Sequence, residues 1–397
     1  MNQTPRGNRL HIAIFGRRNA GKSSLINALT NQDIALVSEV AGTTTDPVYK
    51  AMEILPIGPV LIIDTAGIDD EGIVGNLRIQ KTKEVLNKTD VAIIVTDPQI
   101  AIGNFEEELI AIMKERKIPT IIAVNKIDLV NTNDKEIHYA GLPTISLSAK
   151  YKEGIEELKR LIIDVAPSTA EKPLLDTLVE KGDMIVLVTP IDSSAPKGRM
   201  ILPQVQVIRA ILDADAVMTV CKETQLEETL SHLKNGPKLV ITDSQAFKEV
   251  NEKLPKDIPL TSFSIIYANH KGDLKTLVEG TNGIRKLRDG AKVLIAEGCS
   301  HHRQDEDIGT VKIPKWLEQI SGKKLDFQWV QGTAFPDNLE GFDLVVHCGS
   351  CMQNRKEMLY RIGVAERAGV PIVNYGVLIS YVNGILDRTI APFLKKG

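Results

Sequence analysis

The chain has 397 residues, of which 43% are hydrophobic and 25% are charged, and its formal net charge is −3. This length predicts about two to four domains, and the small negative charge argues against a broad nucleic-acid surface. No apolar run approaches the length of a membrane span, and the first residues lack the apolar region of a signal peptide. We therefore expect a cytoplasmic protein with neither a membrane nor a nucleic acid as partner.

A predicted strand at residues 11–15 leads into a phosphate-binding loop. Residues 16–23 read Gly-Arg-Arg-Asn-Ala-Gly-Lys-Ser, which fits the pattern G-x-x-x-x-G-K-S/T, and a helical pattern follows. Backbone N–H groups of such a loop cradle phosphate oxygens, Lys22 would reach the β- and γ-phosphates, and the Ser23 hydroxyl would bind Mg²⁺. The residues expected to bind the phosphates are Gly16, Asn19, Ala20, Gly21, Lys22, Ser23 and Ser24.

A second predicted strand, at residues 61–63, is followed by residues that can bind the Mg²⁺ ion and the γ-phosphate. Asp64 follows this strand directly and can hold Mg²⁺ through water. The N–H group of Gly67 can sense a γ-phosphate. Both residues therefore join the predicted nucleotide site.

Two later strand ends carry the residues expected to recognise the base. After the predicted strand at residues 121–124, the carboxylate of Asp128 can accept two hydrogen bonds from the N1–H and N2 amino groups of guanine. Adenine cannot supply that pair, so this element selects GTP or GDP over adenine nucleotides. The residues expected around the base are Asn125, Lys126, Asp128, Ser148, Ala149 and Lys150.

Residues 9 to about 165 resemble the GTPase domains of the bacterial tRNA-modification and ribosome-assembly group. The resemblance rests on the phosphate-binding loop and on the sequence Gly-Thr-Thr-Thr-Asp at residues 42–46. It implies that Thr44 completes the Mg²⁺ shell and acts in catalysis with Lys22 and Asn19. In such relatives the matching asparagine coordinates a K⁺ ion that assists hydrolysis. The residues alone also allow Asn19 to be a polar loop residue that tolerates a turn conformation.

One position departs from Ras-type GTPases. Ile68 stands where those proteins carry the glutamine that orients water. The carboxylates that follow either orient water or form a solvated loop, and they belong to Asp69, Asp70 and Glu71. We therefore predict slow intrinsic hydrolysis of GTP to GDP and phosphate.

The middle of the chain alternates strand and helix patterns after a Pro-rich linker at residues 166–173. This alternation predicts a largely parallel sheet, with strands at residues 184–188, 216–220, 238–242 and 262–266. The region carries no catalytic signature, which leaves it as a surface for pairing subunits through an edge strand or an exposed helix face. Cys221 has no thiol or histidine near it in sequence and is expected to be a small buried apolar residue.

Three cysteines follow two predicted buried strands in the last part of the chain. Cys299 comes after residues 293–296, and Cys348 and Cys351 come after residues 344–346. Loops beyond strand ends are where open α/β sheets bind ligands. Thiols in a chain without an export signal are more typical of metal ligands than of disulfides. The two loops meet only if their strands are neighbours.

The thiol set fits three kinds of site. Three thiolates with an open fourth position suit a [4Fe–4S] cluster, a Cys₃His arrangement suits structural zinc, and Cys-x-x-Cys suits redox chemistry. The sequence leaves the fourth ligand open among two histidines and three carboxylates. Each histidine equally suits a hydrogen-bonded residue outside the metal shell. These candidates are His301, His347, Asp305, Glu306 and Asp307.

The combination of motifs resembles one family over the whole chain. Cys299-x-His301 with His347-Cys348-x-x-Cys351, after a GTPase domain, is similar to the GTPase maturation factor of [FeFe]-hydrogenase, the factor F family. The resemblance implies a scaffold, carrier or chaperone that binds a [4Fe–4S] cluster and a two-iron precursor. It also implies a homodimer or higher oligomer, two radical-enzyme maturases as partners, and apo-[FeFe]-hydrogenase as the recipient.

The predicted fold class is α/β, with an N-terminal P-loop GTPase domain and two smaller α/β domains with largely parallel sheets. The predicted domains are a GTP-binding domain at residues 1–170, a dimerisation domain at 171–270 and an iron–sulfur cluster domain at 271–397. Two rival functions remain from the residues alone: an RNA-handling or ribosome-assembly GTPase with a structural zinc domain, and a thiol-redox enzyme regulated by GTP.

Overall fold

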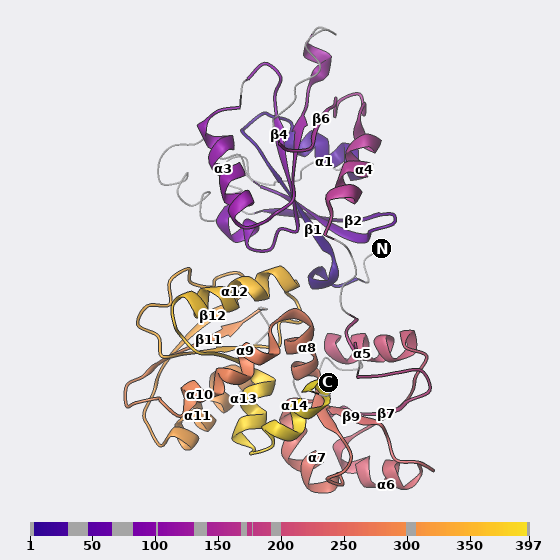
Figure 1. The fold of residues 1–397 in the computed structure, drawn as a ribbon, viewed down its shortest axis with the longest axis vertical. Coiled ribbons are helices and arrows are strands. Elements are labelled where there is room, and N and C mark those ends of the chain that lie inside the picture. The colour runs from indigo at the N-terminus through magenta and orange to yellow at the C-terminus, as the bar shows by residue number, and fades with distance from the viewer. Residues whose placement is uncertain are drawn as a thin grey trace. The chain divides into compact units, whose positions relative to one another are not determined.

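The computed structural model describes residues 4–30, 47–65, 82–100, 102–130, 141–167, 173–176, 178–191, 200–298 and 307–394. The chain divides into two compact units, residues 1–169 and 170–397 (Figure 1). This division falls inside the predicted linker. The further boundary at residue 270 stays a prediction. None of the described helices is long and apolar enough to span a membrane.

The first unit is built on a sheet of six described strands in the order β2-β3-β1-β4-β5-β6. Strand β2 runs antiparallel to β3, and the other neighbouring pairs are parallel. Every residue of β4 and β5 is buried, as expected for parallel strands covered on both faces. The strands are β1 (Leu10–Phe15), β2 (Val48–Ile54), β3 (Gly58–Asp64), β4 (Val91–Thr96), β5 (Thr120–Val124) and β6 (Thr144–Ser146).

Helices cover both faces of this sheet. Helices α1 (Lys22–Thr30) and α4 (Ile155–Val165) pack on one face, and α3 (Asn104–Glu115) packs on the other (Figure 1). Two single 3₁₀ turns are η1 (Arg6–Asn8) and η2 (Ile127–Leu129). The loops with the nucleotide motifs start at the carboxyl ends of β1, β3 and β5.

The second unit begins with a parallel sheet in the order β10-β9-β7-β8. Its strands are β7 (Met184–Val188), β8 (Val217–Cys221), β9 (Leu239–Thr242) and β10 (Leu260–Ser262). Its helices and turns are α5 (Leu202–Asp213), η4 (Glu223–Gln225), α6 (Leu226–Ser231), η5 (Ser244–Ala246), α7 (Phe247–Lys253) and α8 (Phe263–Lys271). The prediction that Cys221 is buried is confirmed.

A third parallel sheet, in the order β12-β11-β13-β14, completes the second unit. Because β11 and β13 pair directly, the cysteine loops leave neighbouring strands, as the metal-site hypothesis requires. The strands are β11 (Lys292–Glu297), β12 (Asp326–Gln331), β13 (Leu344–His347) and β14 (Ile372–Asn374). The helices are α9 (Leu274–Glu279), α10 (Thr281–Ile284), η6 (Ile308–Lys312), α11 (Ile313–Ser321), α12 (Arg355–Arg367), α13 (Tyr375–Val382) and α14 (Leu386–Leu394).

The sequence prediction of a strand at residues 262–266 is wrong. Strand β10 ends at Ser262, whose hydroxyl accepts a hydrogen bond from the Ile265 N–H at 3.3 Å and so caps helix α8. Helix α8 is buried on most of its surface. Its apolar run therefore lacks the polar face that would distinguish a helix from a buried strand.

The last helix of the second unit joins its two sheets. Helix α14 packs against β10, and one hydrophobic core includes residues of β7, β11 and β13. The guanidinium of Arg388 on α14 donates to Asn251 Oδ1 at 2.7 Å, to the Ile258 carbonyl at 2.9 Å and to the Pro255 carbonyl. The third sheet is thereby tied to the loop that precedes β10.

We predict that Arg388→Met lowers the free energy of unfolding of the second unit by about 2–3 kcal/mol, since hydrogen bonds to charged groups contribute about 1.5–3 kcal/mol each. Urea denaturation of the full chain measures this. The control is Lys286→Met, an exposed residue, which should stay within about 0.5 kcal/mol of the wild type. Equal midpoints for the two variants would contradict the prediction.

Candidate functional site

The phosphate-binding loop connects β1 to α1, and the side chain of Lys22 forms hydrogen bonds with the backbone of this loop. The Lys22 ammonium is 7% exposed and donates to the carbonyl oxygens of Gly16 at 2.7 Å and Arg17 at 2.8 Å. The Ser23 hydroxyl donates to Asp64 Oδ2 at 3.1 Å. The structure thus brings together the two side chains predicted to hold Mg²⁺, one at the start of α1 and one at the end of β3.

The surroundings of the Asp64 carboxylate favour a cation bound beside it. Burial raises the pKa of Asp64, while the Ser23 hydrogen bond and the charges of Lys22 and Lys50 oppose that shift. A bound divalent ion would stabilise the ionised carboxylate further. The donor set of a hydroxyl and a carboxylate fits Mg²⁺, which prefers oxygen ligands.

Asn125 links the loops that surround the predicted base site. Its side-chain amide donates from Nδ2 to the Ala20 carbonyl at 3.0 Å, and its Oδ1 accepts from the Ala149 N–H at 3.0 Å. The Ser148 hydroxyl donates to Asp128 Oδ1 at 2.6 Å. Residues from three motifs that are far apart in sequence therefore converge at one edge of the sheet. Of the other predicted residues, Ser24 belongs to α1 and Lys150 directly follows Ala149.

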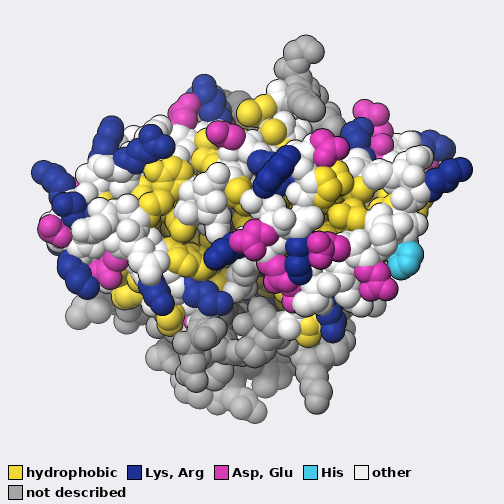
Figure 2. Space-filling view, turned by 90° about the horizontal axis from the view of Figure 1, so that it is seen from below, with side chains coloured by type: hydrophobic (Ala, Val, Ile, Leu, Met, Phe, Trp, Pro, Cys, Tyr) yellow, Lys and Arg dark blue, Asp and Glu magenta, His cyan; other side chains and the backbone are white. Residues whose placement is uncertain are grey.

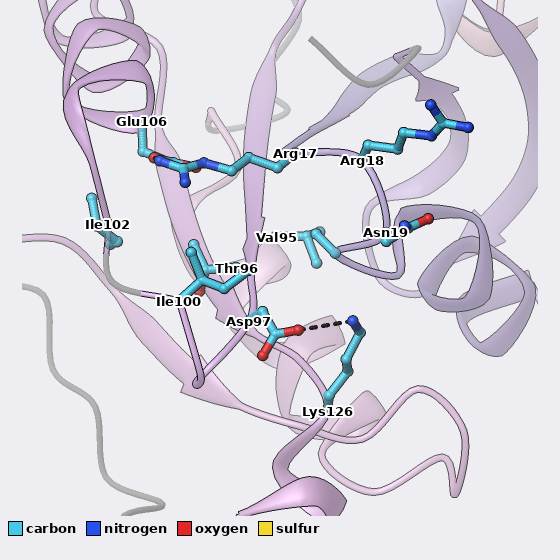
Figure 3. Close-up of a pocket in the computed structure, with 11 residues that line it drawn as sticks. Arg17, Arg18, Asn19, Val95, Thr96, Asp97, Ile100, Ile102, Glu106 and Lys126 are labelled. Atoms are coloured by element: carbon cyan, nitrogen blue, oxygen red, sulfur yellow. Dashed lines mark hydrogen bonds and ion pairs between the residues drawn. The ribbon is translucent and has the colours of Figure 1, made fainter. Parts of the chain in front are cut away.

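A cavity of about 60 Å³ lies against the phosphate-binding loop and shows two ion pairs that the motifs do not reveal (Figure 3). Arg17 forms two hydrogen bonds of 2.7 Å with the carboxylate of Glu106 on α3. Lys126 pairs with Asp97 at 2.8 Å. Asp97 directly follows the buried strand β4, which is a sequence signal that could have identified it. Glu106 lies within a helix, and its sequence position offers no comparable signal.

Asn19 has a φ of 62°, a left-handed conformation that asparagine tolerates better than most residues. This fits its interpretation as a turn residue and leaves the potassium interpretation untested. Several predicted residues of the nucleotide site lie outside the described part of the chain. They are Thr44, Gly67, Ile68, Asp69, Asp70 and Glu71.

The second candidate site lies at the ends of β11 and β13. Cys348 and Cys351 are free thiols, and the Gly298 N–H donates to Cys348 Sγ at 3.0 Å. Cys299 directly follows Gly298 but lies outside the described residues, as do His301, Asp305 and Glu306. Among the described residues no group of three His, Cys, Asp or Glu side chains could hold a metal ion. The structure therefore describes two of the three predicted thiol ligands.

His347 is buried beneath the cysteine loop with both ring nitrogens near protein partners. Its Nε2 lies 3.0 Å from Arg361 Nη1, and its Nδ1 lies 3.2 Å from the Ser350 hydroxyl. Burial, together with the Arg361 charge, lowers the pKa of His347 to about 3. The imidazole is therefore neutral, and its contacts suit a hydrogen-bonded support of the loop better than a metal ligand.

The carboxylate candidate that the structure describes, Asp307, caps a helical turn. Its Oδ2 accepts hydrogen bonds from the Thr310 N–H at 2.9 Å and from the Thr310 hydroxyl at 3.0 Å. In this arrangement the oxygen is committed to the start of η6. The other two carboxylate candidates, Asp305 and Glu306, keep their standing as sequence predictions.

The surroundings of Cys348 and Cys351 suit a site that binds a soft metal. Burial raises the pKa of Cys348 to about 11, against the effect of the Gly298 and Ser350 N–H groups, and burial also raises the pKa of Cys351, against the charge of Lys271. Both thiols are thus protonated until a cation displaces the proton. Two buried polar atoms near this loop, Tyr267 Oη and Gln353 Oε1, have no hydrogen-bond partner in the part of the chain that the structure describes. Thiols and unpaired polar atoms together fit a bound metal–sulfur group.

Curated GTPases match part of the chain. The tRNA modification GTPase MnmE of Dechloromonas aromatica is 36% identical over 160 residues, covering 40% of this chain and 35% of that protein. GTPase Der of Mycoplasmopsis pulmonis is 35% identical over 204 residues, covering 47% of this chain and 46% of that protein. The chain thus spans less than half the length of either relative. Among solved structures, Era of Aquifex aeolicus has a TM-score of 0.36 at 20% identity over 53% of this chain and 91% of that one, a likeness too weak to bear on function.

Three family models match the chain in succession. The 50S ribosome-binding GTPase model matches residues 11–126. The hydrogen maturase F dimerization domain matches residues 174–272, and the hydrogen maturase F tetramerization domain matches residues 275–392. The two maturase models follow one another directly and together span both sheets of the second unit. With a GTPase domain before them, the chain belongs to the hydrogen maturase F family.

Proposed function

We propose that the protein is a GTP-hydrolysing scaffold and carrier that binds a [4Fe–4S] cluster and a two-iron precursor. It delivers the precursor to apo-[FeFe]-hydrogenase, with two radical-enzyme maturases as partners in building it. The observation that carries this proposal is the pair of half-buried thiols, Cys348 and Cys351, in the loop that follows β13 beside the end of β11, in a chain of the hydrogen maturase F family.

The nucleotide site would act through contacts already present between its loops. Lys22 would turn from the loop carbonyls to the β- and γ-phosphates, and Ser23 and Asp64 would hold Mg²⁺, with Thr44 completing its shell. Asp128, oriented by the Ser148 hydroxyl, would accept the two hydrogen bonds that guanine offers. Without the water-orienting glutamine, hydrolysis would be slow, and a K⁺ ion held by Asn19 would stabilise charge in the transition state.

The cluster would be held by Cys299, Cys348 and Cys351, with His301 or Glu306 as candidates for the fourth ligand. A [4Fe–4S] cluster supplies a soft, redox-active group whose properties depend on hydrogen bonds and charges around its sulfurs. The Gly298 N–H already donates to Cys348 Sγ. His347 and Arg361 would keep the cysteine loop in place from beneath.

A second copy of the chain would pair along β8. This strand ends the sheet order β10-β9-β7-β8, and no other described strand pairs with its outer side. The opposite edge strand, β10, is buried and covered by α14. Hydrophobic side chains of the second unit are exposed on β8 and on the neighbouring α5, namely Val205, Leu212, Val217 and Val220. Unpaired edges with exposed apolar side chains favour pairing with another chain.

Anaerobic reconstitution with iron and sulfide tests the cluster proposal. The wild-type chain should bind iron and sulfide in the ratio of a [4Fe–4S] cluster and activate an apo-hydrogenase after transfer. Cys348→Ser should lose most of the bound iron, because a hydroxyl replaces a soft thiolate ligand. Cys221→Ser, a matched substitution far from the loop in sequence, should retain it. A colourless wild-type chain with one tightly bound zinc would favour the alternative of a GTPase with a structural zinc domain.

The potassium proposal predicts a rate that depends on the cation. GTP hydrolysis by the wild type should be faster in K⁺ than in Na⁺ at equal ionic strength. Asn19→Ala should remove this difference and slow the K⁺-supported rate by about tenfold or more, since a positive charge at the transferring phosphate can contribute up to about 10³–10⁵ in rate. Equal wild-type rates in the two salts would refute the proposal.

The pairing proposal predicts that Val220→Lys lowers the oligomeric state, because a charge at an edge strand opposes pairing with another strand. Light scattering on the full chain measures the mass. Val48→Lys is the control, since Val48 is 38% exposed on the edge strand β2 and Val220 is 45% exposed on β8. The control should keep the wild-type mass, and a monomeric wild type would count against the proposal itself.

A further inference from the structure

Helix α8 presents a buried lysine to the cysteine loop of the third sheet. The ammonium of Lys271, the last residue of α8, is 2% exposed. It donates to the carbonyl oxygens of Ser350 at 3.3 Å, Cys351 at 3.1 Å and Gln353 at 2.7 Å. An ammonium has three N–H groups, so these three carbonyls match its donors in number. The Lys271 side chain thus forms hydrogen bonds with the loop backbone at Cys351 and on both sides of it.

The loop at this point has a conformation that needs support. Ser350 lies at φ 55°, in the left-handed region that costs free energy for residues other than glycine and persists where the surroundings impose it. The Ser350 hydroxyl is also tied to His347 Nδ1 at 3.2 Å and to the sulfur of Met358 at 3.0 Å. Lys271 holds the same residue from α8, so the turn between the two thiols is fixed from two directions.

One turn earlier on α8, Tyr267 offers an unused donor. Its ring centroid lies 5.2 Å from Lys271 Nζ, and the residue is 2% exposed. Among the described residues its hydroxyl has no hydrogen-bond partner, although a buried polar group without one is costly. Burial and the nearby Cys351 thiol both raise the pKa of Tyr267.

We propose that Lys271 and Tyr267 are positioning residues for whatever metal–sulfur group the thiolates of Cys348 and Cys351 bind, an inference that rests on the proposed function. Lys271 holds the loop in its ligating conformation, and its charge favours the more reduced, more negative state of the group. The Tyr267 hydroxyl donates its hydrogen bond to sulfur once the group is bound.

The proposal gives the middle of the chain a second role. Both residues lie within residues 174–272, the segment that the dimerization model matches. Hydrophobic packing joins the same helix to the third sheet, since Ala268 shares a core with Leu294 and Val345. The region that would pair subunits therefore also contributes contacts that shape the metal loop.

Amide hydrogen exchange on the full chain, without added metal, tests the positioning role. The Gln353 N–H donates to the Ser350 carbonyl at 3.1 Å, which Lys271 also contacts. Lys271→Met should speed exchange of the Gln353 amide at least about tenfold, and Lys271→Arg should restore protection. The Cys348 amide, bonded to Ala296 in the sheet, is the internal control. Unchanged exchange at Gln353 in Lys271→Met would overturn the positioning role.

The reduction potential of the chain reconstituted with iron and sulfide tests the electrostatic role. Lys271→Met should lower the midpoint potential by about 59 mV or more, equal to a tenfold change in the ratio of reduced to oxidised group for one electron. Lys275→Met removes a lysine that is 84% exposed on α9 and should leave the potential unchanged. Equal potentials for wild type and Lys271→Met would overturn the electrostatic role.

Tyr267→Phe separates the hydroxyl from the rest of the side chain. Because the hydroxyl bonds to none of the described residues, this variant should fold and unfold in urea like the wild type or with a higher midpoint. In the loaded chain it should lower the potential and change the electron paramagnetic resonance signal, since a donor to sulfur is lost. An unchanged signal and potential would overturn the role of Tyr267. A wild type that binds no iron and sulfide would refute the proposed function instead, while the exchange experiment would still decide the role of Lys271.

Discussion

Buried or half-buried cations bonded to backbone carbonyls hold the loops that leave the sheets of this chain. Lys22, Lys271, Arg361 and Arg388 each donate to carbonyl oxygens of loops. A loop beyond a strand end has carbonyls that no neighbouring strand pairs, and a buried cation needs acceptors to offset its lost hydration. The cation supplies hydrogen-bond donors to the unpaired carbonyls, and the carbonyls supply acceptors to the cation. Loops become ordered in this way without additional secondary structure.

The parallel sheets determine where those loops gather. Parallel strands end at the same edge, so residues from distant motifs meet there. In the first unit this edge brings Ser23 to Asp64 and Asn125 to Ala20. In the second unit the pairing of β11 with β13 places Gly298 against Cys348. On the face shown in Figure 2, hydrophobic side chains also reach the surface in patches among charged ones.

Features that depend on local chemistry leave a signal in the sequence. Asp64, Asn125 and Asp128 could be assigned to the predicted nucleotide site because each motif needs fixed residue types directly after a buried strand, and the structure brings residues of these motifs together. The parallel sheets followed from alternating strand and helix patterns. The bond between Arg17 and Glu106 could not be predicted, because nothing in the spacing of two residues 89 positions apart indicates contact.

The incorrect strand prediction concerned residues whose neighbours are distant in sequence. The apolar run at residues 262–266 gave no sign of a helix, because α8 is buried between two sheets and lacks a polar face. Lys271 is the last residue of that helix. Its three contacts with the cysteine loop depend on how α8 packs, which no local pattern encodes.

The cover that α14 gives to β10 also affects the order in which the second unit can form. A ribosome makes β10 before the whole of the third sheet, and makes α14 after it. During synthesis β10 therefore lacks its contact with α14 at first, and the core shared by the two sheets is incomplete. Unpaired strand edges attract other chains. The nascent chain thus exposes this strand until α14 has been made.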